Sequence, residues 1–282
     1  MATTNTSENR TLGYSSLNNL LNWKDGVPNP KTNLLLIDTF ATEANFLFNH
    51  FITNYIQQKS PVLFVGFKNI FNHYNLILKK MGCNLLLAKK SNLFYFIDGF
   101  TQLTSSEKIE QNTANVDLTL QLNLKDKERV LSEMTEKLVD LIQSAAQSSP
   151  SGQLGALMID DLSTLFNCGV STITVINMLK RLKVELNKVG SSLIVLVHGD
   201  KELSESTEHC KFIQLIMNQF MIWFKVEPLP SGYSRDVDGQ MSIYRGYEYY
   251  QSPTQIEPNL VHFQLKDTSV EFFNRGTSKN VL

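Results

Sequence analysis

Hydrophobic and polar positions over the first two-thirds of the chain follow two patterns in turn. Short continuous apolar runs predict buried strands, and apolar residues recurring every three or four positions predict helices with one buried face. The predicted strands cover residues 34–37, 62–65, 93–97, 157–159 and 193–197. The predicted helices carry apolar stripes over residues 48–55, 71–81, 131–141, 173–186 and 208–217. This alternation is typical of an α/β protein whose mostly parallel central sheet is covered by helices on both faces.

After residue 220 the pattern changes to alternation of single apolar and polar positions, which predicts strands with one buried face. The alternating segments are residues 220–226, 241–243 and 261–265, with prolines and glycines between them. Residues 266–269 predict a tight turn into a last strand over 270–273. Because consecutive strands joined by short turns are antiparallel, we expect these strands to extend the C-terminal edge of the sheet.

Two polar segments interrupt this organisation. Residues 1–12 predict a flexible tail, and residues from about 101 to 125 are rich in Thr, Gln, Asn and Ser, which indicates a mobile insertion. Ser16 is placed to cap a short helix over the apolar residues that follow it. No repeat is present and no linker divides the remainder, so we predict a single domain over residues 13–282.

Composition excludes several classes of protein. The 282 residues carry a net charge of −1, which leaves no overall basic field for nucleic acid or an anionic membrane. Cys83, Cys168 and Cys210 form no CxxC pair, and this favours a reducing compartment over a disulfide framework or a zinc site. The most apolar stretch, residues 212–224, is too short and too polar to span a bilayer. We expect a soluble protein of the cytoplasm, with the nucleus as an additional location.

The turn after the first strand has the sequence Asp38-Thr39-Phe40-Ala41-Thr42-Glu43-Ala44. Nucleotide-binding α/β proteins place a glycine-rich phosphate cradle here, followed by a lysine and a serine or threonine, and this turn has neither glycine nor lysine. Asp38 and Glu43 place negative charge at the N-terminus of the next helix, where it satisfies the helix dipole and repels a triphosphate. Phe40 adds bulk. The turn therefore argues against self-contained ATP hydrolysis.

Asp160 and Asp161 follow an apolar strand, as a magnesium-binding aspartate does in NTP-binding sheets. The alternative interpretation is that Asp161 caps the following helix and Asp160 organises the end of the strand. We treat the pair as candidates for a vestigial magnesium site and expect no bound metal or cofactor. His198 and Asp200 follow a later strand without a nucleophile motif beside them, which favours a structural role.

Arg235 and Asp236 lie side by side in the segment 231–240, whose glycines and aspartates fit a turn between two strands. An arginine at an exposed strand connection also suits a contact with RNA or with a partner subunit. These two residues are the candidates for such a contact.

Six segments resemble, in the same order, segments of the sixth subunit of the Elongator complex. They are residues 17–21, 71–82, 159–163, 195–198, 232–239 and 266–273. The resemblance extends from about Leu17 to Leu282, apart from the insertion, and rests on the ordered set of segments. It implies a RecA-like fold without a working phosphate loop. The catalytic glutamate that RecA-like ATPases place after an early strand is also lacking, since this chain has Gly66-Phe67-Lys68 there.

The resemblance also implies assembly with the fourth and fifth Elongator subunits, two copies of each, in a hexameric ring. That ring binds tRNA and supports wobble-uridine modification of the 5-carboxymethyluridine type by the catalytic Elongator subunits. Any ATP hydrolysis would belong to the assembled ring. We therefore expect a non-catalytic RecA-like subunit with no membrane contact. The alternative is an autonomous RecA-like NTPase with an unorthodox phosphate site that uses Asp160 for magnesium.

Overall fold

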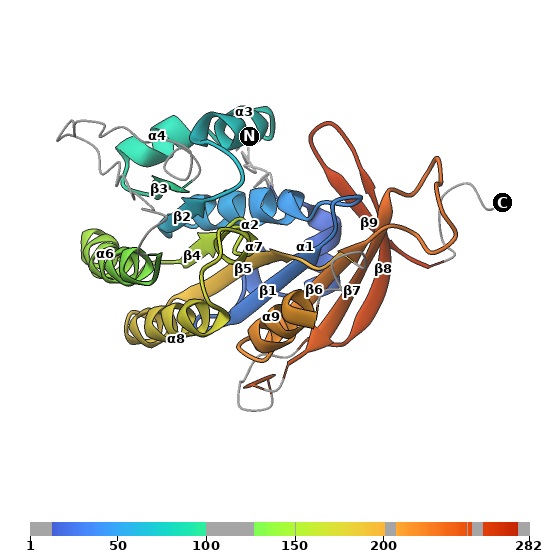
Figure 1. The fold of residues 1–282 in the computed structure, drawn as a ribbon. Coiled ribbons are helices and arrows are strands. Elements are labelled where there is room, and N and C mark those ends of the chain that lie inside the picture. The colour runs from blue at the N-terminus through green and yellow to red at the C-terminus, as the bar shows by residue number, and fades with distance from the viewer. Residues whose placement is uncertain are drawn as a thin grey trace, which may run out of the picture.

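The computed structural model describes residues 13–99, 127–149, 151–200, 207–246, 248–249 and 256–275, and one nine-stranded sheet organises them (Figure 1). The predicted tail, residues 1–12, and the predicted insertion, residues 101–125, lie outside the described residues. The strand order is β3-β2-β4-β5-β1-β6-β7-β8-β9. The first strand of the chain is therefore a central strand, with β5 on one side and β6 on the other.

Six strands of the sheet are parallel. They are β1 Asn33–Asp38, β2 Val62–Gly66, β3 Phe94–Asp98, β4 Ala156–Ile159, β5 Ser192–His198 and β6 Ile222–Glu227. Three antiparallel strands, β7 Gly239–Arg245, β8 Asn259–Leu265 and β9 Val270–Asn274, continue the sheet beyond β6. This is the architecture predicted for a RecA-like α/β fold, and the predicted antiparallel extension at the C-terminal edge is confirmed.

Helices cover both faces of the sheet (Figure 1). One face carries α1 Ser15–Leu21, the 3₁₀ turn Lys24–Gly26, α2 Asn45–Gln57, α3 Phe71–Lys80 and α4 Leu85–Lys90. The other face carries α6 Lys127–Ser148, α7 Ser163–Asn167, α8 Thr172–Lys188 and α9 Thr207–Met217. Across the described ranges, none of the helices has the length and apolar character that crossing a membrane requires.

The apolar runs form strands because the two helical layers bury both faces of the sheet. In β1, Leu34 and Leu36 belong to the core beneath α1 to α4, whereas Leu35 and Ile37 belong to the core on the side of α6 to α9. All four side chains are buried. A strand covered on both faces is apolar at every position, so it does not alternate between apolar and polar residues. The predicted one-sided strands β6 and β8 do alternate between buried and more exposed positions, whereas β7 has three buried residues in a row at 241–243.

Ser16 does not cap a helix, contrary to the prediction. Tyr14 occupies the N-cap of α1 without a side-chain cap, and the Ser16 hydroxyl instead donates to the carbonyl of Val270 at 3.0 Å and accepts from the amide of Phe272 at 3.2 Å. Both partners belong to β9, the last strand of the sheet. A serine near the start of the domain thus satisfies backbone groups of an edge strand that would otherwise invite pairing with another chain.

Two short helices were not predicted. The first, α4, is six residues long and begins where the side chain of Asn84 accepts hydrogen bonds from the amides of Leu86 and Leu87. The second, α7, has five residues. Helices of fewer than two turns show too few apolar repeats for a periodic signal, so their absence from the prediction has a physical reason.

Candidate functional site at the carboxyl ends of the central strands

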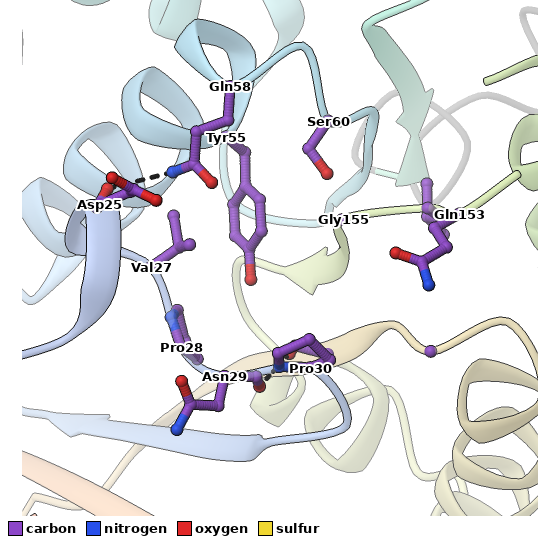
Figure 2. A pocket seen from close by; sticks show the side chains of 13 residues that line it. Asp25, Val27, Pro28, Asn29, Pro30, Tyr55, Gln58, Ser60, Gln153 and Gly155 are labelled. Atoms are coloured by element: carbon purple, nitrogen blue, oxygen red, sulfur yellow. Dashed lines mark hydrogen bonds between the residues drawn. The ribbon is translucent and has the colours of Figure 1, made fainter. Parts of the chain in front are cut away.

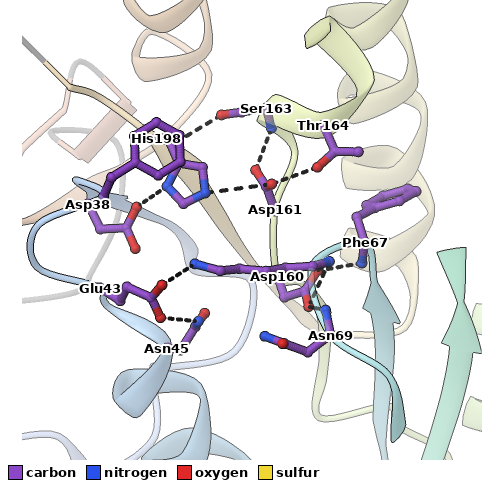
Figure 3. Close-up of polar contacts among 12 residues, drawn as sticks. Asp38, Glu43, Asn45, Phe67, Asn69, Asp160, Asp161, Ser163, Thr164 and His198 are labelled. Atoms are coloured by element: carbon purple, nitrogen blue, oxygen red, sulfur yellow. Dashed lines mark hydrogen bonds and ion pairs between the residues drawn. The ribbon is translucent and has the colours of Figure 1, made fainter. Parts of the chain in front are cut away.

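The polar residues singled out in the sequence meet at one edge of the sheet. Asp38 and His198 form the last residue pair of the β1–β5 register, and Asp160 and Asp161 directly follow the neighbouring strand β4 (Figure 3). All these strands are parallel, so their carboxyl ends lie together. Open α/β sheets bind ligands at this edge, which makes it the candidate site.

Backbone amides in the turn between β1 and α2 already have carboxylate partners. The amide of Ala44, next to the start of α2, donates to Oδ2 of Asp38 at 2.9 Å. The amide of Phe40 donates to Oδ1 of Asp200, in the segment after β5, at 2.9 Å. In a phosphate cradle, amides in this turn would point at phosphate oxygens. Here protein carboxylates occupy these donors, as predicted for Asp38.

The bulk of Phe40 suggested that this side chain fills the inside of the turn, but it does not. Its side chain is 67% exposed, and its ring lies 5.0 Å from the ring of His198, centroid to centroid. His198 itself is only 4% exposed. The phenylalanine therefore shields the histidine from solvent, and the obstacle to a phosphate inside the turn is the occupied amides.

Asp160 is completely buried and is held by donors from the segment after β2. Its Oδ1 accepts from the amides of Phe67 at 2.5 Å and Lys68 at 3.1 Å, and its Oδ2 accepts from the amide of Asn69 at 3.3 Å. The hydroxyl of Tyr74, on α3, donates to Oδ2 at 2.5 Å. The protein itself thus satisfies both oxygens of this carboxylate (Figure 3).

Gly66 allows the segment after β2 to fold closely around Asp160. A Cβ atom at this position would lie 2.7 Å from the carbonyl oxygen of Asn69 and 2.7 Å from the ring of Phe96. Neither a backbone carbonyl nor a buried ring can move aside easily. The residue before the Asp160 donors therefore has to be glycine for steric reasons, although its own φ is not positive.

Lys68 supplies positive charge to the site from an unexpected place. Its Nζ lies 2.9 Å from Oε1 of Glu43, in the turn after β1, so it connects the segment after β2 to that turn. The hydrogen bond and charge of Lys68 overcome the opposing effect of burial and lower the pKa of Glu43. RecA-like ATPases place a catalytic glutamate after an early strand. The segment expected to correspond in this chain carries Lys68 instead, and this lysine is paired with Glu43 within the protein.

His198 lies between two carboxylates. Its Nδ1 is 2.5 Å from Oδ1 of Asp38, and its Nε2 is 3.6 Å from Oδ2 of Asp161. Because both ring nitrogens face carboxylates, neither is directed at a hydroxyl or thiol nucleophile. The arrangement suits the structural role predicted for His198, which is to neutralise buried acidic groups at the strand ends.

Asp161 lies one residue before the N-cap of α7, which is Leu162, and accepts hydrogen bonds from the first turn of that helix. Its Oδ1 accepts from the amide of Ser163 at 3.0 Å, and its Oδ2 accepts from the hydroxyl of Thr164 at 2.6 Å. These are the first residues of α7. Capping by Asp161 and organisation of the strand end by Asp160 were the alternative to magnesium binding. Both carboxylates accept hydrogen bonds within the protein, although Asp161 does so from the position before the N-cap and not as the N-cap residue.

Burial sets the protonation of this cluster. It raises the pKa of Asp160 to about 6, despite the hydrogen bonds from Tyr74, Phe67 and Lys68 that favour the ionised form. Burial on its own would lower the pKa of His198, but the hydrogen bond and negative charge of Asp38 outweigh it, so this pKa is raised. The contact with Asp38 thus favours the protonated form of His198, whereas burial raises the pKa of Asp38 despite the hydrogen bond and charge of His198.

We expect the contribution of His198 to the free energy of unfolding to fall as the pH rises from 6.5 upward, so that the unmodified protein loses stability relative to His198→Asn over this range. His198 has a higher pKa in the folded protein than its value of 6.5 in the unfolded chain, so its contribution is complete below pH 6.5 and is lost as the pH rises through the folded pKa. Urea denaturation of the protein and of His198→Asn at several pH values between 6 and 8 measures this slope. Equal slopes for the two proteins would show that His198 is not the group responsible.

The described residues include no set of three or more His, Cys, Asp or Glu side chains that could hold a metal ion. The geometry gives the reason at the two candidate positions, because Asp160 and Asp161 already accept hydrogen bonds from protein donors at both of their oxygens. A magnesium ion at Asp160 would have to compete with the four donors that already contact its two oxygens.

Arg235 and Asp236 lie in a different part of the same sheet. They belong to the connection between β6 and β7, and β5 and β1 separate β6 from β4. The side chain of Arg235 is exposed and that of Asp236 is half-buried, with the amide of Asp236 donating to the hydroxyl of Ser234 at 3.4 Å. Arg235 is thus presented to solvent at a turn between strands, as expected from the sequence, and its predicted contact with RNA or a partner stays a prediction.

Three residues that the sequence interpretation did not assign to the site complete it: Lys68, Tyr74 and Asp200. Lys68 had been noted only as a departure from a catalytic glutamate, and Tyr74 only as part of an apolar stripe. Asp200 carried a weak signal, since it stands two residues beyond a strand-end histidine. Tyrosines and lysines that follow other strands are natural partners of buried carboxylates, and this consideration could have suggested Lys68 and Tyr74.

A family model described as Elongation complex protein 6 matches residues 14–267. The chain belongs to this family. It is 29% identical to Elongator complex protein 6 of Xenopus laevis over 255 residues, which cover 88% of this chain and 92% of the relative. Identity is 27% over 272 residues with the Danio rerio protein of that name and 25% over 270 residues with the Homo sapiens one. Each of these two alignments covers 95% of this chain and all of the relative.

Membership of the Elongation complex protein 6 family confirms the resemblance inferred from the six ordered segments. All six begin within the matched region, and only the last extends past residue 267.

Proposed function

We propose that this chain is a non-catalytic subunit of the Elongator complex in which a RecA-like fold serves as a building block. The observation that carries the proposal is the state of the turn after β1, where carboxylates of Asp38 and Asp200 accept the amide hydrogens that would bind phosphate. The saturated Asp160 and the pairing of Lys68 with Glu43 support it. A site whose donors, acceptors and charges are matched internally has no chemistry left for ATP.

For the partners, we propose the fourth and fifth Elongator subunits, two copies of each, in a hexameric ring with this chain. The relatives' name, Elongator complex protein 6, supports a place in that complex. The surface of α3 and α4 supports docking, because Leu76, Leu86 and Leu87 are each more than half exposed on two helices that contact one another. Neighbouring exposed leucines are typical of protein–protein contact.

The ring in turn would bind tRNA and support wobble-uridine modification by the catalytic Elongator subunits, in the cytoplasm and also in the nucleus. The role of this chain would be architectural. It would hold its neighbours in place and contribute exposed loops to a composite RNA surface, which is consistent with a chain of net charge −1 that lacks a basic field of its own.

Co-expression with a tag on this chain tests the assembly. We expect two further RecA-like proteins to co-purify with it in equal amounts, and the triple variant Leu76→Asp, Leu86→Asp, Leu87→Asp to reduce their recovery. A triple variant with glutamine at the exposed polar positions Lys80, Lys90 and aspartate at Asn92, which also lowers the charge by three, is the matched control. Recovery of the tagged chain alone would contradict the proposal.

The purified chain tests the alternative of an autonomous NTPase. We expect no binding of ATP by calorimetry in the presence of magnesium and no phosphate release above the buffer background. Turnover by the chain alone that is lost in Asp160→Asn would establish the alternative and overturn the non-catalytic assignment.

Arg235→Glu is expected to weaken tRNA binding by the assembled ring by about tenfold, because it replaces an exposed positive charge with a negative one near the phosphate backbone. The ring itself should remain intact on a sizing column. Arg129→Glu, at an exposed position of α6, is the charge-matched control. Equal affinities of the two variants in a filter-binding or anisotropy titration would rule out a contact at Arg235.

A further inference from the structure

Exposed lysines stand at the edge of the sheet opposite to the site described above, where the parallel strands begin. Lys31 lies shortly before β1, Lys59 before β2 and Lys90 before β3. The segment 44–97, which includes two of them, holds six lysines and neither aspartate nor glutamate, in a chain of net charge −1. We call Lys31, Lys59 and Lys90 the basic rim, and the site at the carboxyl ends of the strands uses none of them.

The turns that carry the basic rim are joined into one row. Four backbone hydrogen bonds of 2.8–3.1 Å run between neighbouring turns, from the amides of Val62, Gly155, Ser192 and Leu193 to the carbonyls of Leu93, Pro61, Gly155 and Thr32, in that order. Figure 2 shows the turns before β1, β2 and β4 around a hollow of about 230 Å³. The lysines are therefore mounted on backbone that the sheet holds in place.

Two lysines of the basic rim have a backbone conformation that favours glycine. The φ of Lys31 is 66° and that of Lys59 is 55°. The turns before β4 and β5 have glycine in the same conformation, with φ values of 68° at Gly152 and 69° at Gly190. A side chain with a Cβ is strained in this region, whereas glycine is not. Strain that is kept at an exposed position indicates that the side chain itself has a role.

Compensation of helix dipoles is the simplest alternative explanation, because lysines are favourable at helix C-termini. Lys188, the last residue of α8, fits this explanation and is also paired with Glu185 at 2.8 Å. Lys31 does not follow an α-helix, and no carboxylate of the described residues pairs with Lys31, Lys59 or Lys90. Dipole compensation would equally favour acidic residues in the first turns of α3 and α4, and these turns have none. It therefore does not account for the whole pattern.

The length of the basic rim fits the backbone of a nucleic acid. In the strand order, β3 and β1 are separated by four strand spacings of about 4.8 Å each, or about 19 Å. This distance equals roughly five or six base-pair steps of about 3.4 Å. A row of separate positive charges over such a length can contact successive phosphates of one strand.

The side chains around the basic rim favour phosphates over other partners. The turns before the first five strands are residues 28–32, 57–61, 90–93, 151–155 and 187–191. They contain no arginine or aromatic residue that could read a base, and none of the exposed large apolar side chains of the described residues lies in them. Apolar anchors are what a protein pocket or a membrane surface would need. Asp25 is the only acidic residue that lines the hollow between the turns.

We propose that the basic rim binds the phosphate backbone of structured RNA without regard to base sequence. This deepens the RNA-binding role proposed above and rests on it only for the kind of nucleic acid. The contact lies where the parallel strands begin, whereas Arg235 belongs to the connection that follows the carboxyl end of β6.

A salt titration with a tRNA transcript tests the proposal, both with the co-purified assembly and with the full-length chain alone. The rim variant is Lys31→Gln, Lys59→Gln, Lys90→Gln. Between about 50 and 200 mM salt, we expect it to bind about tenfold or more weakly. The slope of log affinity against log salt should be smaller by about 2 to 3, because each lost phosphate contact removes about 0.9.

The matched control removes three lysines from exposed positions of α6, α8 and α9. It is Lys137→Gln, Lys180→Gln, Lys211→Gln, and it should keep the slope of the unmodified protein. Equal slopes for the rim variant and this control, with RNA still bound, would overturn the assignment to the rim and leave ring assembly and RNA binding standing. Absence of RNA binding by both the assembly and the chain would overturn this proposal and the proposed RNA-binding role together.

A glycine variant separates binding from folding. Lys31→Gly, Lys59→Gly removes the two side chains from backbone that glycine adopts without strain, so it should not lower the melting temperature. RNA binding should still fall. A lower melting temperature with unchanged RNA affinity would show that the lysines are structural and would overturn the proposal. Loss of the partner proteins from the rim variant, or binding to phosphatidylserine vesicles but not to RNA, would overturn it in favour of a protein or a membrane.

Discussion

Replacement of Asp160 with alanine is expected to lower the free energy of unfolding by about 3–5 kcal/mol, a large part of the total stability of a typical domain. The variant leaves the amides of Phe67, Lys68 and Asn69 and the hydroxyl of Tyr74 buried without their acceptor. Asp160→Asn should cost less but still about 2 kcal/mol, because an amide nitrogen then faces backbone donors. Urea denaturation followed by circular dichroism measures all the variants.

Three further measurements separate this explanation from a metal site. Asp140→Ala, at an exposed position of α6, should change stability by no more than about 0.5 kcal/mol, and Tyr74→Phe should cost about 1 kcal/mol. Addition of magnesium should not raise the melting temperature, whereas a magnesium site at Asp160 would make it rise with concentration. An Asp160→Ala protein as stable as the original would show that the four donors find water instead.

Asp38→Ala is expected to cost about 3 kcal/mol, because it leaves His198 buried without the carboxylate that faces its Nδ1. His198→Ala should likewise be destabilising, since it leaves Asp38 buried without its cationic partner. The double variant should cost clearly less than the sum of the two single ones. A double-mutant cycle in urea measures this coupling.

The exposed ion pair of Arg129 and Glu133 on α6 is the matched control. The same cycle there should give a coupling of about 0.5 kcal/mol or less, because water screens the pair. Additive effects of Asp38→Ala and His198→Ala would mean that the two residues contribute to stability separately. The contact between them would then add nothing to the free energy of unfolding.

The sequence was sufficient to predict most of the fold. Leu34 to Ile37 form a continuous apolar run, and β1, which contains it, extends only one residue further at each end. The helical stripe over 173–186 lies within α8, Thr172–Lys188. These predictions succeed because the spacing of apolar residues along the chain depends on how an element is buried. A strand buried on one face, a strand buried on both faces and a helix with one buried stripe each give a different spacing. The hydrogen bonds between Ser16 and β9 produce no such repeating pattern in the sequence, since a single hydroxyl makes them.

The sequence indicated where in the sheet the candidate site lies, but not which groups its side chains contact. Parallel strands bring their carboxyl ends together, and this rule alone places Asp38, Asp160 and His198 near one another. It does not reveal that Asp160 is held by amides more than ninety positions earlier in the chain, because backbone amides carry no residue identity. Lys68 was overlooked for a related reason: the search for a positive charge was confined to the turn after β1.

The central position of β1 has a consequence for the order in which the chain is made. This strand is the first to leave the ribosome, yet its neighbours are β5, which begins at Ser192, and β6, which begins at Ile222. At a synthesis rate of about 5–20 residues per second, β1 waits roughly ten to forty seconds for both edges to be paired. During that interval an apolar strand with two open edges must be kept from aggregating, so the nascent chain is a natural client for ribosome-associated chaperones.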